Sequence, residues 1–194
     1  MSFQSVSQGD AVPLFVIAGP SGVGKGTIVS RLLDASSRIW ISISATTRPS
    51  RPGETEGVHY YFVTDEEFDR LIDEGEMLEW AYVHGKHRYG TPRQPVLEAQ
   101  AQGLIPLLEI DLDGARQIRK SMPEAVQIFI EPPSMEELER RLRGRGTEDE
   151  EEIARRMETA RGEMAARDEF DVRIVNRDVS GATRQILHLM GLDK

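Results

Sequence analysis

The chain has 194 residues, of which 39% are hydrophobic and 29% are charged, and these proportions are typical of one soluble globular domain. It contains no cysteine, which excludes a disulfide scaffold, a thiolate metal site and cysteine nucleophile chemistry. Its formal net charge of −9 argues against a broad surface for nucleic acid or anionic lipid, so any anionic ligand must be bound by local positive charge.

The segment that opens the chain, residues 1–12, is polar and has no basic start followed by an apolar stretch, so it does not resemble a secretory signal. We expect it to be a flexible tail. The first apolar run, residues 14–18, is far shorter than the roughly 20 residues that a helix needs to cross a bilayer, so no membrane span is expected. These missing signals favour a cytoplasmic protein.

A glycine-rich segment follows the first apolar run. The strand-like sequence LFVIAG (14–19) leads into GPSGVGKGT (19–27) and then into a helix with Ile28, Leu32 and Leu33 on its buried side. Glycines let such a loop turn tightly with its amide hydrogens inward, and the helix start adds positive potential. The plain alternative is a glycine-rich turn with an exposed lysine. The preceding strand, the glycine spacing, the lysine and the following helix all match a phosphate-binding motif instead. We therefore predict a phosphate-binding loop made of Gly19, Pro20, Ser21, Gly22, Val23, Gly24, Lys25, Gly26 and Thr27, which by itself would suit a GTPase, an ATPase or a small-molecule kinase.

Lys25 is the residue of this loop that we expect to reach the outer phosphates and to act in catalysis. The usual pattern GxxxxGK[ST] places a hydroxyl immediately after the lysine, whereas this chain has Gly26 there. Thr27 carries the nearest hydroxyl. It is therefore our candidate for the contact to phosphate or magnesium, one position later than usual.

The remaining apolar runs alternate with segments of helical period. The runs are 39–44, 77–83, 104–110, 125–131 and 172–176, and helices are expected at 92–102, 111–121 and 178–190. Several of the runs are continuous, as the strands of a parallel sheet are when helices cover both of its faces. We therefore predict an α/β fold.

Residues 45–63 are rich in proline, glycine and polar side chains, so no buried sheet strand is expected there. Together with 77–91, this insertion is predicted to form a small substrate-binding lobe beside the main sheet. Arg48 and Arg51 lie three residues apart in it, and Tyr60 follows. Guanidinium groups and a tyrosine hydroxyl suit the dianionic phosphate of a nucleoside monophosphate, although either arginine alone would be read as a solvated loop residue.

Carboxylates occupy unusual positions in two apolar runs. Glu79 interrupts MLEWAYV, where an unpaired carboxylate would be costly, so it either meets a ligand that donates hydrogen bonds or simply faces water from a strand. Asp111 follows the run at 104–110 and could serve the same ligand as Glu79, cap the next helix, or do both. Glu109 ends the same run, at the sheet edge where α/β proteins expose functional carboxylates, and could orient magnesium through water.

Two consecutive helices are predicted in the C-terminal third of the chain. Ser134 and Glu137 have the spacing of a capping box, and Thr147 and Glu150 repeat it. The glycines of GRG (144–146) lie between the two helices. They indicate a joint that can bend, as the attachment of a moving lid requires.

Four segments resemble guanylate kinase, in order and over almost the whole chain: ISATTRPSRPGETEGVHYYF (43–62), GEMLEWAYVHGKHRYGT (75–91), LLEIDLDG (107–114) and LRGRGTEDEEEIARRM (142–157). The resemblance implies a P-loop three-layer α/β fold with a mostly parallel sheet in a single domain (1–194). It also implies a GMP-binding lobe at about 44–95 and a helical lid at about 141–160. The implied reaction is phosphoryl transfer from ATP to GMP, and to dGMP, with magnesium bridging the ATP phosphates.

The resemblance also assigns roles to individual residues. The implied GMP-binding set is Ser44, Arg48, Arg51, Tyr60, Glu79, Tyr89, Thr91 and Asp111. Arg141, Arg145 and Arg156, each alone a plausible surface arginine, match the lid arginines that balance charge on the transferred group, so we count them with Lys25 and Arg48 as catalytic. Arg145 and Asn176 match the walls of the adenine site.

Other functions stay open at this stage. The fold could serve another acceptor, such as a different nucleoside monophosphate or a sugar bisphosphate, although guanine explains Glu79, Asp111 and Tyr89 together. Guanylate-kinase-like modules of scaffold proteins bind peptides without catalysis, but they lose nucleotide-site residues that this chain keeps. A switch GTPase is disfavoured because no NKxD motif is present.

The chemistry expected at this site needs few auxiliary groups. No general base is expected, because an acceptor phosphate with a second pKa of about 6 is already an anion near neutral pH. The histidines lack metal-ligand spacing, so no zinc site is expected. The expected partners are ATP and GMP, with neither nucleic acid nor membrane, and the oligomeric state is left open.

Overall fold

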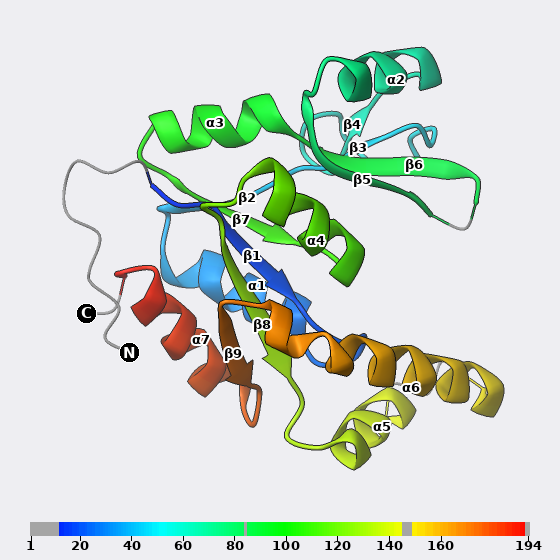
Figure 1. Cartoon of the computed structure of the whole chain (residues 1–194), viewed down its shortest axis with the longest axis vertical. Coiled ribbons are helices and arrows are strands. Elements are labelled where there is room, and N and C mark those ends of the chain that lie inside the picture. The colour runs from blue at the N-terminus through cyan, green and yellow to red at the C-terminus, as the bar shows by residue number, and fades with distance from the viewer. Residues whose placement is uncertain (1–11, 84, 145–148, 193–194) are drawn as a thin grey trace.

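A computed structural model describes residues 12–83, 85–144 and 149–192, and its central sheet has five parallel strands (Figure 1). In spatial order the strands are β2 (Ile39–Ile41), β7 (Ile105–Glu109), β1 (Phe15–Ala18), β8 (Val126–Glu131) and β9 (Val172–Val175). Five of the six apolar runs are therefore confirmed as strands of one parallel sheet. Residues 1–11 of the expected tail lie outside the described residues, and the carbonyl of Val12 accepts a hydrogen bond from Gln100 at 2.5 Å.

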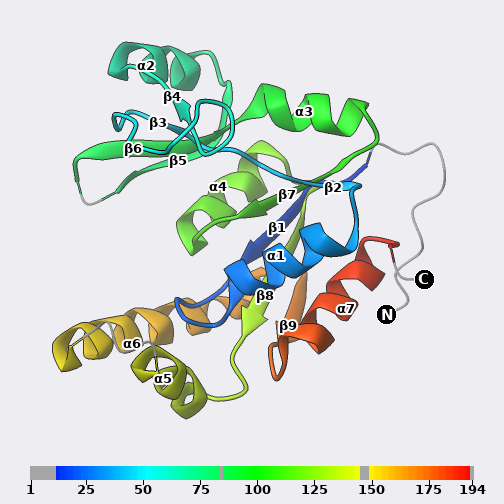
Figure 2. The same ribbon diagram turned by 180° about the vertical axis from the view of Figure 1, so that it is seen from behind.

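Helices cover both faces of this sheet (Figures 1 and 2). One face carries α1 (Lys25–Ala35) and α7 (Val179–Leu189), and the other carries α3 (Arg93–Ala101) and α4 (Leu112–Ser121). Phe15 and Ile17 pack on the side of α1 and α7, whereas Leu14 and Val16 pack on the side of α3 and α4. Because successive strand residues enter two different cores, the whole run must be apolar. This is the predicted three-layer α/β fold.

A second sheet of four strands lies beside the first, in the order β4–β3–β6–β5. Its strands are β3 (Ala45–Thr46), β4 (Tyr61–Phe62), β5 (Met77–Val83) and β6 (His87–Pro92). The expectation that 45–63 holds no buried strand is wrong at Ala45 and Thr46, which are both 0% exposed. The prolines and glycines of this segment begin only at Pro49, so these two residues keep the backbone donors that a strand needs.

One helix of this region, α2 (Asp65–Asp73), is not predicted from the sequence. Its cap is Thr64, whose hydroxyl accepts the backbone N–H of Glu67 at 3.1 Å. Phe68 is fully buried against the second sheet. Buried Arg88 of β6 places its guanidinium carbon 4.7 Å from the Phe68 ring centroid and pairs with two aspartates of α2. These contacts hold α2 on the sheet.

The two helices predicted in the C-terminal third are α5 (Met135–Arg143) and α6 (Glu150–Ala165), and a short 3₁₀ turn, Arg167–Glu169, follows them. Ser134 caps α5 as predicted, because its hydroxyl accepts the N–H of Glu137 at 3.2 Å. The predicted cap at Thr147 is wrong, because the carboxylate of Asp149 accepts the N–H of Glu152 at 2.8 Å. An aspartate directly before the helix supplies both the acceptor and a negative charge for the positive helix end.

The connections place a switch point at β1. The chain leaves β1 through α1 toward β2 on one side, and it later passes from β7 through α4 to β8 on the other side. In open α/β sheets, ligands bind outside the carboxyl ends of the strands at such a point. The candidate site is therefore expected where β1, β7, β8 and β9 end. In the described part of the chain, no helix is long and apolar enough to span a membrane.

Candidate functional site

The loop between β1 and α1 lies at the carboxyl edge of the central sheet. A Cβ at Gly19, where φ is 145°, would lie 2.4 Å from the carbonyl oxygen of Ile130 in β8, so only glycine allows this approach. Gly22 has φ 85°, and a Cβ there would lie 2.6 Å from Cδ2 of Leu142 in α5. The loop therefore turns around the free N–H groups at the start of α1, in a form that suits phosphate oxygens.

Lys25 is the first residue of α1, and its ammonium lies within the loop. Nζ donates to the carbonyl oxygens of Gly19 at 2.5 Å and Pro20 at 3.2 Å. Burial lowers the pKa of Lys25, and the carboxylates of Glu163 and Glu109 are among those that oppose this shift. The phosphate oxygens of a bound nucleotide would replace the two carbonyl groups as acceptors for this ammonium.

Arg141 of α5 and Asn176, directly after β9, meet on the carbonyl oxygen of Val23 in the loop. Arg141 Nη1 donates to it at 3.3 Å and Asn176 Nδ2 at 2.8 Å. Arg141 Nη2 also donates to the carbonyl oxygen of Asn176 at 3.0 Å. The other side-chain atom, Asn176 Oδ1, is buried and has no hydrogen-bond partner among the described residues. An amino group of a ligand would satisfy this acceptor.

Of the other two predicted lid arginines, only Arg156 lies among the described residues. Arg156 of α6 places Nη1 3.5 Å from the hydroxyl of Ser21 in the loop, and Nη2 lies 3.6 Å from a carboxylate oxygen of Glu152. Arg145 lies outside the described residues, so its catalytic and adenine-site roles stay predictions. The same holds for the bending joint, of which only Gly144 is described, in an ordinary helical conformation with φ −66°.

Arg48 is the centre of a cluster in the second sheet. This buried residue donates from Nε to the hydroxyl of Tyr89 at 3.0 Å, and its guanidinium carbon lies 5.4 Å from the ring centroid of Tyr60. The rings of Tyr60 and Tyr89 meet edge to face, with centroids 5.7 Å apart. The structure thus brings together three of the residues predicted to bind the acceptor phosphate. Arg51 is exposed nearby, and its backbone N–H is bonded to Glu54 at 2.7 Å.

Glu79 lies on β5, opposite Thr91 of β6. Its side chain is buried, and its Oε1 accepts the Thr91 hydroxyl at 2.6 Å. A Cβ placed on Gly114 would lie 3.2 Å from Glu79 Oε2 and 3.3 Å from Asp111 Oδ1, so both carboxylates face the start of α4. Burial raises the pKa of Glu79, and the nearby charge of Asp111 adds to this shift. A ligand that donates two N–H groups would relieve it.

Asp111 has the second role that the sequence suggests. Its Oδ1 accepts the N–H of Gly114 at 2.8 Å and so caps α4. The remaining residue of the predicted set, Ser44, is half-buried directly before β3, where its carbonyl oxygen accepts the N–H of Tyr61 at 2.9 Å. Ser44 therefore lies at the passage from the central sheet to the second sheet.

Glu109, at the end of β7, faces the phosphate loop. Desolvation at the sheet edge raises its pKa, and the ammonium of Lys25 opposes this shift. A Cβ on Gly26 would lie 3.8 Å from both carboxylate oxygens of Glu109, so the position after Lys25 opens toward this carboxylate. Thr27 is exposed on the next position of α1. Among the described residues, no three acidic or histidine side chains converge on one point that could hold a metal ion.

Two carboxylates at these sites are not predicted from the sequence. Glu163 of α6 accepts a hydrogen bond from the backbone N–H of Ser21, and burial raises its pKa against the opposing charge of Lys25. Its Oε2 is buried and has no hydrogen-bond partner in the described part of the chain. Glu54 pairs with Arg48 at 2.7 Å. Glu163 follows Arg156 by two helical turns and Glu54 follows Arg51 by three residues, but neither spacing predicts the contact with Ser21 or with Arg48.

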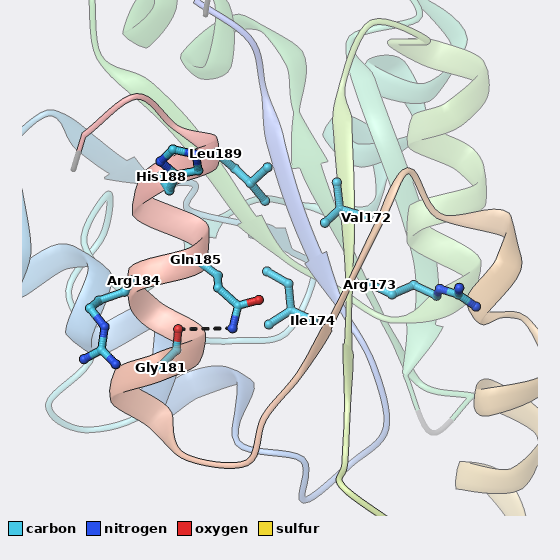
Figure 3. A pocket seen from close by; sticks show the side chains of 8 residues that line it. All are labelled: Val172, Arg173, Ile174, Gly181, Arg184, Gln185, His188 and Leu189. Carbon is cyan, nitrogen blue, oxygen red and sulfur yellow. Dashed lines mark hydrogen bonds between the residues drawn. The ribbon is translucent and has the colours of Figure 1, made fainter. Parts of the chain in front are cut away.

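A separate hollow of about 460 Å³ lies between β9 and α7 (Figure 3). Its lining residues are Val172, Arg173, Ile174, Gly181, Arg184, Gln185, His188 and Leu189. Arg173 points away from α7 and pairs with Asp168 at 2.5 Å, and the amide of Gln185 is bonded to the Gly181 carbonyl within α7. None of the predicted site residues lines this hollow.

Comparison with known proteins agrees with the geometry. The sequence model of the guanylate kinase family matches residues 12–191. The chain belongs to the guanylate kinase family. A guanylate kinase from Thermobifida fusca (strain YX) is 58% identical over 177 residues, which cover 91% of this chain and 90% of that protein. A guanylate kinase from Synechococcus sp. (strain CC9311) is 55% identical over 177 residues, which cover 91% of this chain and 93% of that protein.

The same family appears among solved structures. The crystal structure of guanylate kinase from Anaplasma phagocytophilum is similar to this chain with a TM-score of 0.69 and 37% sequence identity, and the match covers 93% of this chain and 85% of that chain. The resemblance found in the sequence motifs is therefore confirmed at the level of the family and of the fold.

Proposed function

We propose that this protein is an enzyme that transfers the γ-phosphoryl group of ATP to the phosphate of GMP or dGMP, giving ADP and GDP or dGDP. An oxygen of the acceptor phosphate attacks the γ-phosphorus, and the bond from that phosphorus to the β–γ bridging oxygen breaks, so ADP leaves. The observation that carries the proposal is the buried Glu79–Thr91 pair, because it offers carboxylate acceptors beside the Arg48, Tyr60 and Tyr89 cluster.

The lobe at about 44–95 takes GMP in this proposal. Glu79 and Asp111 accept the N1–H and 2-amino hydrogens of guanine, with Ser44 and Thr91 completing the pocket. Arg48, Arg51, Tyr60 and Tyr89 hold the phosphate, for which planar guanidinium groups and tyrosine hydroxyls are suited. Adenine lacks both of these N–H donors, so it would leave the buried carboxylate unpaired. This explains a preference for GMP over AMP.

The phosphate loop takes ATP. Backbone N–H groups from Gly19 to Thr27 and the ammonium of Lys25 bind the phosphates, and the unpaired Asn176 Oδ1 accepts from the 6-amino group of adenine. Arg141, Arg145 and Arg156 lie on the proposed lid, at about 141–160. When it closes, they balance the charge that spreads over the transferred group and exclude water.

Magnesium fits the residues at the loop. Glu109 supplies a hard carboxylate oxygen next to the open position at Gly26, and Thr27 supplies the nearest hydroxyl. Proteins commonly hold Mg²⁺ with one or two carboxylates together with substrate phosphates. When bound, the ion would neutralise charge on the phosphates of ATP. Thr27 and Glu109 are the residues that would hold it, Glu109 through water.

The experiment is a coupled assay of ADP release from ATP and magnesium, with GMP, dGMP, AMP, CMP, UMP or no acceptor offered in parallel. Turnover with GMP and dGMP, and not with the other acceptors, supports the proposal and its assignment of the base pocket. Turnover with a different acceptor would contradict the guanine assignment. Folded protein that binds GMP without turnover would favour a peptide-binding module. We expect the reaction to take place in the cytoplasm.

A further inference from the structure

The guanidinium of Arg48 is held on three sides. Besides the Tyr89 hydroxyl at Nε, Nη1 donates to the carbonyl oxygen of Pro49 at 2.7 Å and Nη2 donates to Glu54 Oε1 at 2.7 Å. A guanidinium has five N–H groups in one rigid plane, so three bonds fix its orientation and leave one N–H on each Nη for a ligand. Without Glu54, the outer nitrogen Nη2 would lose the bond that sets its direction.

Glu54 contacts the second arginine position with its other oxygen. Oε2 accepts the backbone N–H of Arg51 at 2.7 Å, and the backbone N–H of Glu54 donates back to the carbonyl of Arg51 at 3.0 Å. The carboxylate is largely buried, with 19% of its side chain exposed, and the hydrogen bond from Arg48 lowers its pKa. A single side chain therefore connects the guanidinium of Arg48 to the backbone from which Arg51 projects.

We propose that Glu54 is a positioning residue for the acceptor phosphate. It holds Arg48 and Arg51 at a fixed separation, so that two cations bind one phosphate dianion without rearranging. Fixing a loop in its bound geometry raises affinity because less conformational freedom is lost on binding. The inference rests on the proposed function, in which these arginines bind the phosphate of GMP. Glu54 acts through the arginines and does not contact the substrate.

The structure provides a matched control in the same loop. Glu56 Oε2 also accepts a backbone N–H, that of Phe62, at 2.9 Å, and neither arginine is its partner there. Glu54→Gln and Glu56→Gln thus make the same chemical change and both weaken a loop hydrogen bond. We expect Glu54→Gln to raise the KM and the dissociation constant for GMP about tenfold and Glu56→Gln to change them less than threefold. The KM for ATP and the kcat at saturating GMP should change little in both variants.

Three measurements test the proposal: steady-state kinetics, calorimetric titration of GMP without ATP, and a cycle of variants with Arg48→Met. If Glu54 acts through Arg48, its substitution adds little to the loss already caused by Arg48→Met. Equal effects of Glu54→Gln and Glu56→Gln, or an unchanged dissociation constant for GMP in Glu54→Gln, would overturn the inference. If Glu54→Gln does not fold, Glu54→Asp keeps the charge but cannot reach both partners, and the same criteria apply. Wild-type protein that binds GMP without turning it over would contradict the proposed function instead.

Discussion

Replacing Glu79 by glutamine tests the base pocket most directly. The shape of the side chain is kept, but one acceptor oxygen becomes an N–H₂ donor. Glu79 Oε1 already accepts the Thr91 hydroxyl at 2.6 Å, so in the variant this hydroxyl and the guanine N–H groups compete for a single oxygen. Losing a hydrogen bond to a charged group and leaving a buried donor unpaired costs about 2–3 kcal/mol. This corresponds to a 30- to 150-fold lower kcat/KM for GMP, in round figures.

The assay is steady-state kinetics with GMP varied at saturating ATP, followed by ATP varied at saturating GMP. Guanine lies away from the reacting phosphates, so its contacts are made equally in the ground and transition states, and the loss should appear in the KM for GMP. Glu76→Gln, three residues earlier in the same lobe, is the control. A change of less than threefold in the KM for GMP would refute our account of Glu79, and a rise confined to the KM for ATP would reverse the two nucleotide sites.

Although Glu79→Gln should lower kcat/KM for GMP, it should not lower the stability of the fold. Burial raises the pKa of Glu79 in the folded state, so its contribution to stability is fully present below the range of an ordinary glutamate and is lost as pH rises through the raised pKa. Glutamine does not pay this desolvation penalty. Thermal unfolding at neutral pH should therefore show Glu79→Gln at least as stable as the wild type. A clearly less stable variant would show that the carboxylate serves the fold.

Three further substitutions probe the remaining contacts. Lys25→Met should lower kcat on the order of 100-fold, as loss of one donor to a developing charge does, while the calorimetric affinity for GMP stays unchanged; equal losses in both would remove Lys25 from its phosphate role. Gly114→Ala should raise the KM for GMP roughly threefold to tenfold, because the new methyl group lies 3.2 Å from Glu79 Oε2; no change would mean that the carboxylates move freely. Asn176→Ala should raise the KM for ATP about tenfold and leave that for GMP alone, and the opposite result would exclude an adenine contact.

The layers of the fold could be predicted because each strand run meets two cores. Phe15 and Ile17 face one core and Leu14 and Val16 the other, so an unbroken apolar run already indicates a covered parallel sheet. The strand order could not be predicted, since it depends on which distant strands pair. Short elements could not be predicted in this way. Asp149 caps α6 in place of the expected Thr147, because two polar residues before the helix could both serve as its cap. The strand Ala45–Thr46 has too few residues to show an alternating hydrophobic pattern in the sequence.

The parts of the candidate site whose residues lie close together in the sequence could be predicted. The loop from Gly19 to Thr27 and the neighbours Arg48 and Tyr60 follow from spacing and residue type. Glu163 could not be found in this way, because its contact with Ser21 joins residues far apart in the sequence. For Glu54 the difficulty was different, because a glutamate in a polar loop is ordinary until its two oxygens are seen to face two arginine positions.

The contact between Gly22 and Leu142 has a consequence for anyone who redesigns this enzyme. The buried side chain of Leu142 in α5 fills the space that a side chain on Gly22 would need, so the loop and α5 are packed directly against each other. A larger residue on either side would displace the other, and a smaller one at Leu142 would open a void beside the loop. Substitutions at Gly22 therefore need to be combined with smaller side chains in α5, because a larger side chain in the loop would clash with Leu142.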